Sequence, residues 1–122
     1  MRYLCAALLL LSSAVVAGPT QIVDGNYLRY EGTPYGSLFL PCRSTQVWRI
    51  DGGSAKATLL DYYRNSRASQ IAEMRATLVL TVEPIDKTEN PDSTIDAITA
   101  AEAIVSISED EQAIRSCRDA SG

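Results

Sequence analysis

The sequence predicts a mostly β fold, a barrel of five strands with one short helix between the third and fourth strands. Three observations lead to it. Five short segments are rich in β-branched and aromatic residues and are bounded by Gly, Pro and Asn turns. A single segment with helical spacing interrupts them after the third strand. The part of the chain that carries these segments, residues 18–122, has the size of one domain.

The first two strands surround a turn. Asp24–Glu31 alternates around Tyr27 and predicts strand one. The run from Glu31 to Gly36 holds two glycines and a proline, which are typical of a turn. Leu38–Leu40 predicts a brief second strand. Pro41 cannot donate a ladder hydrogen bond, so we expect it at a strand end or on an edge.

The third strand is followed by the helix. Thr45–Ile50 alternates, and its buried face is predicted to be that of Trp48 and Ile50. Ser54 has a hydroxyl that can accept a free amide, which predicts it as the N-cap of a helix over Ala55–Ser66. Its apolar side carries Leu59, Leu60 and Tyr63.

Two more strands complete the pattern. Ala76–Glu83 is the strongest strand segment, and Pro84 is expected to end it. Ile85–Thr94 is polar and predicts a loop, while the pattern of Ile95–Ala101 is compatible with helix or strand. Glu102–Ser108 alternates and predicts the last strand, with an inner face of Ala103, Val105 and Ile107.

This order of three strands, one helix and two strands is that of the OB fold, so we expect an OB-like Greek-key barrel. Closure of the sheet into a barrel removes the exposed strand edges that a small β protein must otherwise protect. An eight-stranded barrel or a seven-stranded sandwich needs more strands than this sequence offers.

The N-terminal segment predicts export. Arg2 precedes the apolar run Leu4–Val16, and small residues lead to a cleavage site after Ala17. Residues 1–17 are therefore expected to be a signal peptide, with a retained anchor as the alternative. The run is shorter than the ~20 residues that span a bilayer, and no transmembrane segment is expected in the mature chain. Cys5 begins the apolar run, whereas the lipidated cysteine of a lipoprotein follows such a run.

Charge divides the remaining domain, residues 18–122. The whole chain has a net charge of −4, and acidic residues dominate from Glu83 onward. This acidic C-terminal segment favours a solvated surface, with binding of calcium or of a cationic partner as the alternatives. Nucleic acid is not an expected partner, because phosphate contacts require clustered Lys and Arg.

Two cysteines remain after cleavage, Cys42 and Cys117, and an oxidising compartment favours a disulfide between them. A redox-active pair is the weaker interpretation, because reactive cysteines are usually close in sequence. Free or metal-bound thiols are the remaining alternative.

No residue pattern points to catalysis, a cofactor or a metal. The chain contains no histidine, which removes the usual general base and zinc ligand. Glu109–Glu111 is a run of carboxylates, and such runs are usually solvated. Gly52–Ser54 resembles an anion-binding turn only superficially, since a turn with a helix cap explains it. We therefore expect a non-enzymatic protein without a cofactor.

Exposed aromatic and basic residues near strands two and three suggest a ligand face. OB barrels bind ligands on these strands and on adjacent loops. Tyr30 and Tyr35 flank the first turn, and Arg43 and Arg49 make the same region mildly basic. These four residues are the predicted ligand face, suited to a saccharide or a protein surface.

The chain resembles the C-terminal OB domain of the NlpE-type envelope lipoproteins. The residues that carry the resemblance lie along most of the mature chain: Gly25-x-Tyr27, Phe39-x-x-Cys42, Trp48, Leu59-Leu60-x-Tyr62, Leu78–Val82 and Cys117. The resemblance implies an OB barrel at a Gram-negative periplasm or outer-membrane face. It does not imply copper binding or adhesion signalling, because this sequence has neither a C-x-x-C motif nor a lipobox.

Two functions are therefore expected, both outside the cytoplasm, periplasmic or secreted. The first is a non-enzymatic binding or interaction module whose partner is an envelope protein or a saccharide. The alternative is an inhibitor of an envelope-attacking hydrolase such as lysozyme, although the Ser-Gly-x-x-Tyr loop of one such inhibitor family is absent. The sequence does not identify the ligand or the oligomeric state.

Overall fold

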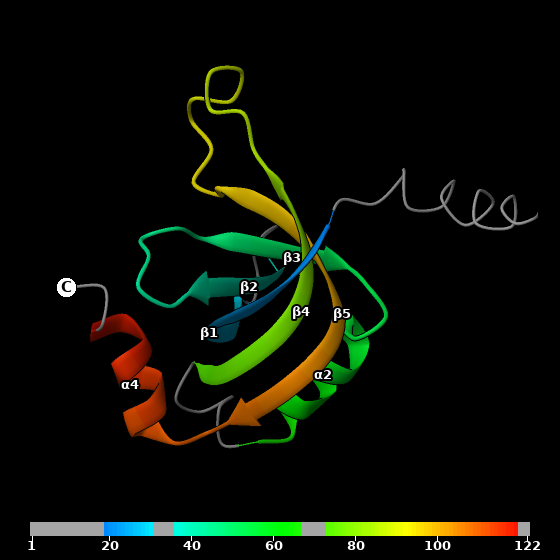
Figure 1. Cartoon of the computed structure of the whole chain (residues 1–122), viewed down its shortest axis with the longest axis vertical. Coiled ribbons are helices and arrows are strands. Elements are labelled where there is room, and N and C mark those ends of the chain that lie inside the picture. Colours follow the sequence, from blue (N-terminus) through cyan, green and yellow to red (C-terminus); the bar gives the residue numbers. More distant parts are fainter. Residues whose placement is uncertain (1–18, 31–35, 67–72, 120–122) are drawn as a thin grey trace, which may run out of the picture.

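The computed structural model describes residues 19–30, 36–66 and 73–119. The predicted signal peptide lies outside this part of the chain. The elements, drawn in Figure 1, are β1 Thr20–Tyr30, β2 Gly36–Pro41, β3 Trp48–Gly52, α2 Lys56–Arg64, β4 Met74–Pro84, β5 Ala97–Ser108 and α4 Glu111–Asp119.

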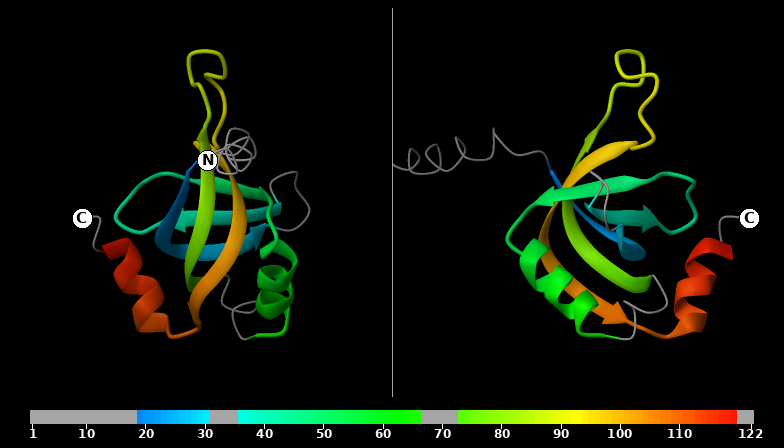
Figure 2. Two further views of the ribbon diagram at one scale, coloured as in Figure 1. Left: turned by 45° about the vertical axis from the view of Figure 1, so that its right-hand side comes forward. Right: turned by 180° about the vertical axis from the view of Figure 1, so that it is seen from behind.

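The strands form a closed barrel in the order β1-β2-β3-β5-β4. All neighbouring strands are antiparallel except β3 and β5, which are parallel. The predicted mostly β, OB-like barrel is therefore confirmed. Both helices lie at one end of the barrel, and the loop between β4 and β5 projects from the other end (Figure 2).

β1 is shared between both halves of the barrel, because it pairs with β4 along Thr20–Tyr27 and with β2 from Gly25 onward. At Gly25 the chain passes directly over Phe39, and an added Cβ would lie 2.5 Å from its ring. Only glycine fits there. Pro41 is the last residue of β2, as expected, and it faces Gly25.

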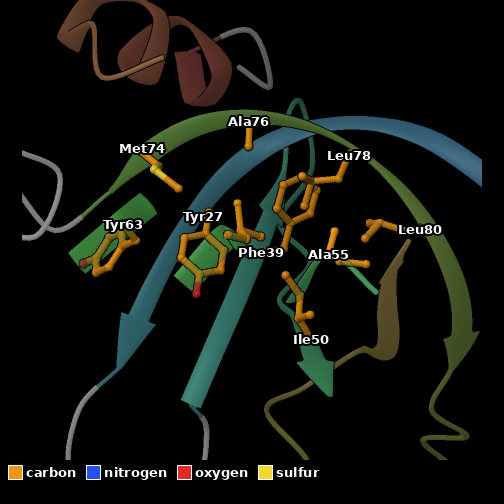
Figure 3. Close-up of a cluster of buried hydrophobic side chains, with 11 residues drawn as sticks. Tyr27, Phe39, Ile50, Ala55, Tyr63, Met74, Ala76, Leu78 and Leu80 are labelled. Atoms are coloured by element: carbon orange, nitrogen blue, oxygen red, sulfur yellow. The ribbon is translucent and has the colours of Figure 1, made fainter. Parts of the chain in front are cut away.

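The core fills the barrel and is closed at one end by α2 (Figure 3). The rings of Tyr27 and Tyr63 meet edge to face, with their centroids 5.3 Å apart. Tyr63 and Leu59 are the buried residues of α2, as predicted, whereas Leu60, predicted on the same side, is only partly buried. Tyr27 is fully buried, its hydroxyl bonds to Ser37 Oγ at 2.8 Å, and burial raises its pKa.

The prediction that Ser54 caps this helix is wrong. Ala55 occupies the N-cap position without a side-chain hydrogen bond. The Ser54 hydroxyl instead donates to the carbonyl of Glu102 at 2.8 Å, and the amide of Ala55 donates to the carbonyl of Ala101. The entry to α2 is thus held by tertiary contacts with β5.

The inner face predicted for β5 is also wrong in part. Ala103 and Val105 are exposed, whereas Ile104 and Ile107 pack against the core. The register against β4 shifts twice, so that Glu102 and Val105 have no partner on β4. Each shift is a β-bulge, and each bulge reverses the alternation of the residues beyond it.

A second helix, α4, was not predicted. It begins after Asp110, whose carboxylate accepts the amide of Ala113 at 3.3 Å. Ile114 and Cys117 are buried against the outer face of the barrel. Among the residues that the structure describes, no helix is long and apolar enough to cross a membrane.

Candidate ligand face

The outer face of β2 and β3 combines apolar and basic side chains. Leu38 and Leu40 alternate with the core residue Phe39 and therefore lie on the opposite, outer side of β2. Leu38 pairs with Arg49 of β3. Val47, which precedes Trp48, shares the side of Arg49.

A hollow of about 280 Å³ lies at the end of this face, where β2 leads into β3. Leu40, Pro41 and Val47 supply apolar surface, and Arg118 reaches it from α4. The remaining lining residues are the polar Ser44, Thr45 and Gln46. We refer to these seven residues as the β2–β3 hollow.

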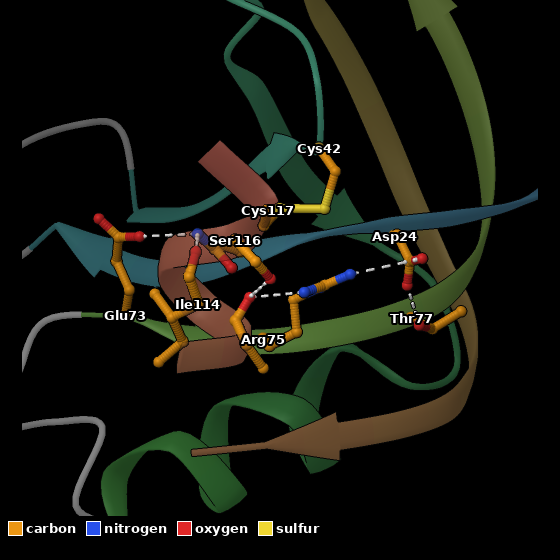
Figure 4. The surroundings of a disulfide bond; sticks show 10 residues. Asp24, Cys42, Glu73, Arg75, Thr77, Ile114, Ser116 and Cys117 are labelled. Atoms are coloured by element: carbon orange, nitrogen blue, oxygen red, sulfur yellow. Dashed lines mark hydrogen bonds and ion pairs between the residues drawn. A yellow bond between two sulfur atoms is a disulfide. The ribbon is translucent and has the colours of Figure 1, made fainter. Parts of the chain in front are cut away.

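A disulfide joins Cys42 to Cys117 (Figure 4). Each cysteine is next in the chain to a residue that lines the hollow, Pro41 and Arg118. The pairing confirms the prediction from the cysteine count. It joins positions 75 residues apart and brings their Cα atoms to 4.6 Å. The amide of Arg43 also donates to the carbonyl of Cys117 at 3.2 Å. The strand connection and α4 are therefore fixed to each other, and Arg118 follows directly in the chain.

Buried polar contacts dock the rest of α4 on the barrel. Asn26 on β1 is fully buried, and its amide group donates to Glu73 Oε1 and to the carbonyl of Ile114, both at 3.0 Å. Arg75 Nη1 donates to the carbonyl of Ala113. Both side chains thus bind backbone carbonyls of the helix, as the close-up in Figure 4 shows for Arg75.

The loop between β4 and β5 is anchored beside the same hollow. Asp96 Oδ2 accepts the amide of Val47 at 2.8 Å, and the amide of Asp96 donates to the carbonyl of Val47 at 2.8 Å. Lys87 Nζ lies 3.0 Å from Asp96 Oδ1. The hydrogen bond from Val47, followed by the interaction with Lys87, lowers the pKa of Asp96.

The structure places two of the four predicted face residues. Arg43 is exposed in the turn after β2, with a positive φ of 58°. Arg49 lies on the outer side of β3, where its guanidinium donates to both carboxylate oxygens of Asp51 at 2.8 and 3.0 Å. The positive charge of Arg49, expected to make this face basic, is therefore partly neutralised by the carboxylate of Asp51. The side chain of Tyr30 and the whole of Tyr35 lie outside the described residues.

A second hollow, of about 420 Å³, lies beside α2 and was missed by the sequence analysis. Tyr62, 43% exposed, contributes the aromatic ring. The other lining residues are Thr58, Asp61, Asn65, Ser66 and Glu109. Helical spacing contained the relevant information, since a helix that buries Leu59 and Tyr63 directs Tyr62 away from the core.

Among residues 19–30, 36–66 and 73–119, no group of three or more His, Cys, Asp or Glu side chains could hold a metal ion. No family model, curated protein or solved structure matches the chain.

Proposed function

We propose that the protein is a non-enzymatic binding module that acts outside the cytoplasm, in the periplasm or secreted, and that binds its partner at the β2–β3 hollow. The observation that carries the proposal is this hollow, which lies where β2 leads into β3 and has an apolar surface from Leu40, Pro41 and Val47. Ligand sites combine such apolar surface with a few placed polar groups.

Rigidity of the hollow supports the same proposal. The disulfide and the Arg43 amide fix one wall, and Asp96 fixes the backbone of Val47 from the other side. A site whose walls are held before binding loses less conformational entropy when a partner arrives. The partner proposed is an envelope protein or a saccharide.

The experiment fills the hollow. Thr45 is exposed and lines it, so Thr45→Trp should occupy the space without disturbing the core. Thr58→Trp is the matched control, since Thr58 is also exposed and lines the hollow beside α2. A partner is first captured with the wild-type protein from envelope extract, identified, purified and titrated by calorimetry.

We expect Thr45→Trp to weaken binding at least about tenfold, or about 1.4 kcal/mol, and Thr58→Trp to leave the affinity unchanged. Equal affinities for Thr45→Trp and the wild type would reject the β2–β3 hollow. Loss of binding only in Thr58→Trp would move the site to α2.

The inhibitor function is the alternative, and the same variants test it. The wild-type protein is added to lysozyme acting on cell walls. If the wild type and Thr58→Trp inhibit lysozyme and Thr45→Trp does not, the partner is the hydrolase. Absence of inhibition together with a captured envelope partner would leave the binding module.

A further inference from the structure

Within residues 19–30, 36–66 and 73–119, the first part of β1 has a neighbouring strand on one edge only. β4 pairs with β1 from Thr20 to Tyr27, but β2 pairs with it only from Gly25 onward. The segment from Thr20 to Val23 therefore lies beside β4 on one edge, while its second edge extends past the end of β2.

The direction of the backbone groups on this edge follows from one hydrogen bond. The amide of Cys42 donates to the carbonyl of Asp24 at 2.9 Å, so Asp24 directs its polar groups away from β4. In an antiparallel ladder these groups alternate from residue to residue, and β1 has no register shift against β4. Thr20 and Ile22 therefore direct their N–H and C=O groups to the open edge.

The side chains around this edge are exposed and uncharged. Thr20, Gln21 and Ile22 are exposed, and Ile22 is 70% exposed. Soluble proteins usually protect an edge with a charge, a bulge or a proline inside the strand, and this segment has none. Pro19 precedes it, and Asp24, which interacts with Arg75, is the first charged residue after it.

We propose that two copies of the protein pair antiparallel through this edge, about a two-fold axis at Gln21. In this register Thr20 lies opposite the partner's Ile22, and Ile22 lies opposite the partner's Thr20. Both residues direct N–H and C=O groups to the edge, so the pairing makes four backbone hydrogen bonds and leaves none of these groups unused.

The ends of the open segment fit the same register. Val23 lies opposite the partner's Pro19 at a position that needs no hydrogen bond, so the missing N–H of proline costs nothing. The carbonyl of Asp24 already accepts the Cys42 amide and limits the pairing. The open stretch thus pairs with its own copy over its full length.

Charge and apolar surface favour a second copy. Each chain has a net charge of −4, but the pairing segment is neutral, so like charges are not brought together at the seam. Ile22 pairs with Val79 on β4, and Val79 pairs with the exposed Ala103 on β5. Ile22, Val79 and Ala103 thus lie side by side across three strands. In the dimer, the partner's Thr20 would cover Ile22 on the side away from Val79.

The decisive variant is Ile22→Pro. The Ile22 N–H points away from β4, so proline removes a donor from the dimer edge and none from the barrel. Gln21→Pro is the matched control, because the Gln21 N–H points toward β4. The exported protein, its N-terminus verified by mass spectrometry, is measured by sedimentation equilibrium and thermal unfolding.

We expect a dimer for the wild type and a monomer for Ile22→Pro. The thermal midpoint of Ile22→Pro should equal that of the wild type diluted until it is monomeric, whereas Gln21→Pro lowers the midpoint further. A wild-type protein that is monomeric throughout a dilution series would overturn the proposal. A dimer that persists in Ile22→Pro would do the same.

Crosslinking keeps the proposal testable if Ile22→Pro fails to fold. Directly opposite residues without hydrogen bonds have Cα atoms about 4.5 Å apart, within the range of a disulfide. Gln21→Cys should therefore form a covalent dimer on mild oxidation. Thr20→Cys should not, since Thr20 and the partner's Thr20 are offset along the strands. Equal crosslinking of the two variants, or none in Gln21→Cys, would reject the register.

Discussion

Gly52 and Gly53 are adjacent in the chain but have different structural roles. Gly53 has a φ of +103°, and an added Cβ would lie 2.2 Å from the carbonyl oxygen of Ala101. A Cβ at Gly52 would meet nothing within 4 Å. The close approach at Gly53 lets the Ala55 amide reach the Ala101 carbonyl at 2.8 Å.

Gly53→Ala should therefore destabilise the protein by about 1–3 kcal/mol, because it combines a strained backbone with a steric conflict against β5. Gly52→Ala is the control and should change the free energy of unfolding by less than about 0.5 kcal/mol. Urea unfolding monitored by Trp48 fluorescence measures both. A small effect at Gly53 would mean that the entry to α2 can shift away from β5.

Asp96 couples the β4–β5 loop to the start of β3, and its lowered pKa makes this coupling depend on pH. A carboxyl whose pKa is lower in the folded protein contributes stability above its unfolded pKa of about 3.9 and loses it as pH falls through the folded value. Asp96→Asn keeps an oxygen for the Val47 amide but removes the charge near Lys87.

We expect Asp96→Asn to destabilise the protein by about 0.5–1 kcal/mol at neutral pH and to differ less from the wild type below about pH 4. Asp92→Asn, at an exposed position of the same loop, is the control. A difference that stays constant from neutral to acidic pH would show that charge on Asp96 is not the cause.

In α2, the sequence predicted which side of the helix is buried, but it did not predict the hydrogen-bond partner of Ser54. The inward side of α2 followed from the spacing of Leu59 and Tyr63. Ser54 was assigned to the helix beside it, but its hydroxyl binds Glu102, which is 48 positions away. A local pattern holds no information about a carbonyl from a distant strand.

Elements with strict periodicity were predicted correctly, and those with altered periodicity were not. β4 keeps alternating burial through most of its length, and the sequence located it within two residues. β5 contains two bulges, so its inward residues are spaced irregularly. Its predicted face is wrong at Ala103 and Val105, and Ile107 packs against the core as predicted. The bulges are defined only by the pairing with β4.

α4 escaped prediction because its nine residues are mostly polar, and the few apolar ones gather on one face of a short helix. Asp110 as a cap, Glu111 in the first turn and Arg118 in the last turn are the features that could have indicated it. The helix is held against the barrel, and its strongest link to the barrel is the disulfide from Cys117 to Cys42.

Removal of the disulfide should release α4 from the barrel. The double variant Cys42→Ser, Cys117→Ser is expected to lose roughly 2–5 kcal/mol, as is usual for native disulfides of small secreted domains. Urea unfolding with and without reductant measures this loss. Reductant should bring the wild type to the stability of the variant and leave the variant unchanged. Equal stability of wild type and variant without reductant would show that noncovalent contacts alone dock α4.

For the whole molecule, the order of strands and helix was sufficient to predict the barrel, since few topologies accept that order. The ligand face predicted from the sequence centres on strands two and three and remains a prediction. The β2–β3 hollow also includes Arg118 of α4, whose neighbour Cys117 is bonded to Cys42. The sequence predicted the disulfide without indicating which surface it shapes.

Export of the protein is a separate prediction from the sequence. The mature protein should begin at Gly18 and carry no lipid, because the small residues that precede it match a signal peptidase site. Intact-mass spectrometry of protein isolated from the periplasm or medium tests this. A species that retains Met1, or one with an acyl chain, would contradict it.

The disulfide also bears on the order in which the molecule is completed. Cys117 follows all five strands in the chain, so the bond cannot close until every strand has been synthesised. It therefore secures a barrel that can already be assembled, and an oxidising enzyme would act last, on a nearly native substrate. The chain contains three cysteines, and removal of the segment with Cys5 would leave a single pairing, so oxidation would then need no later correction by an isomerase.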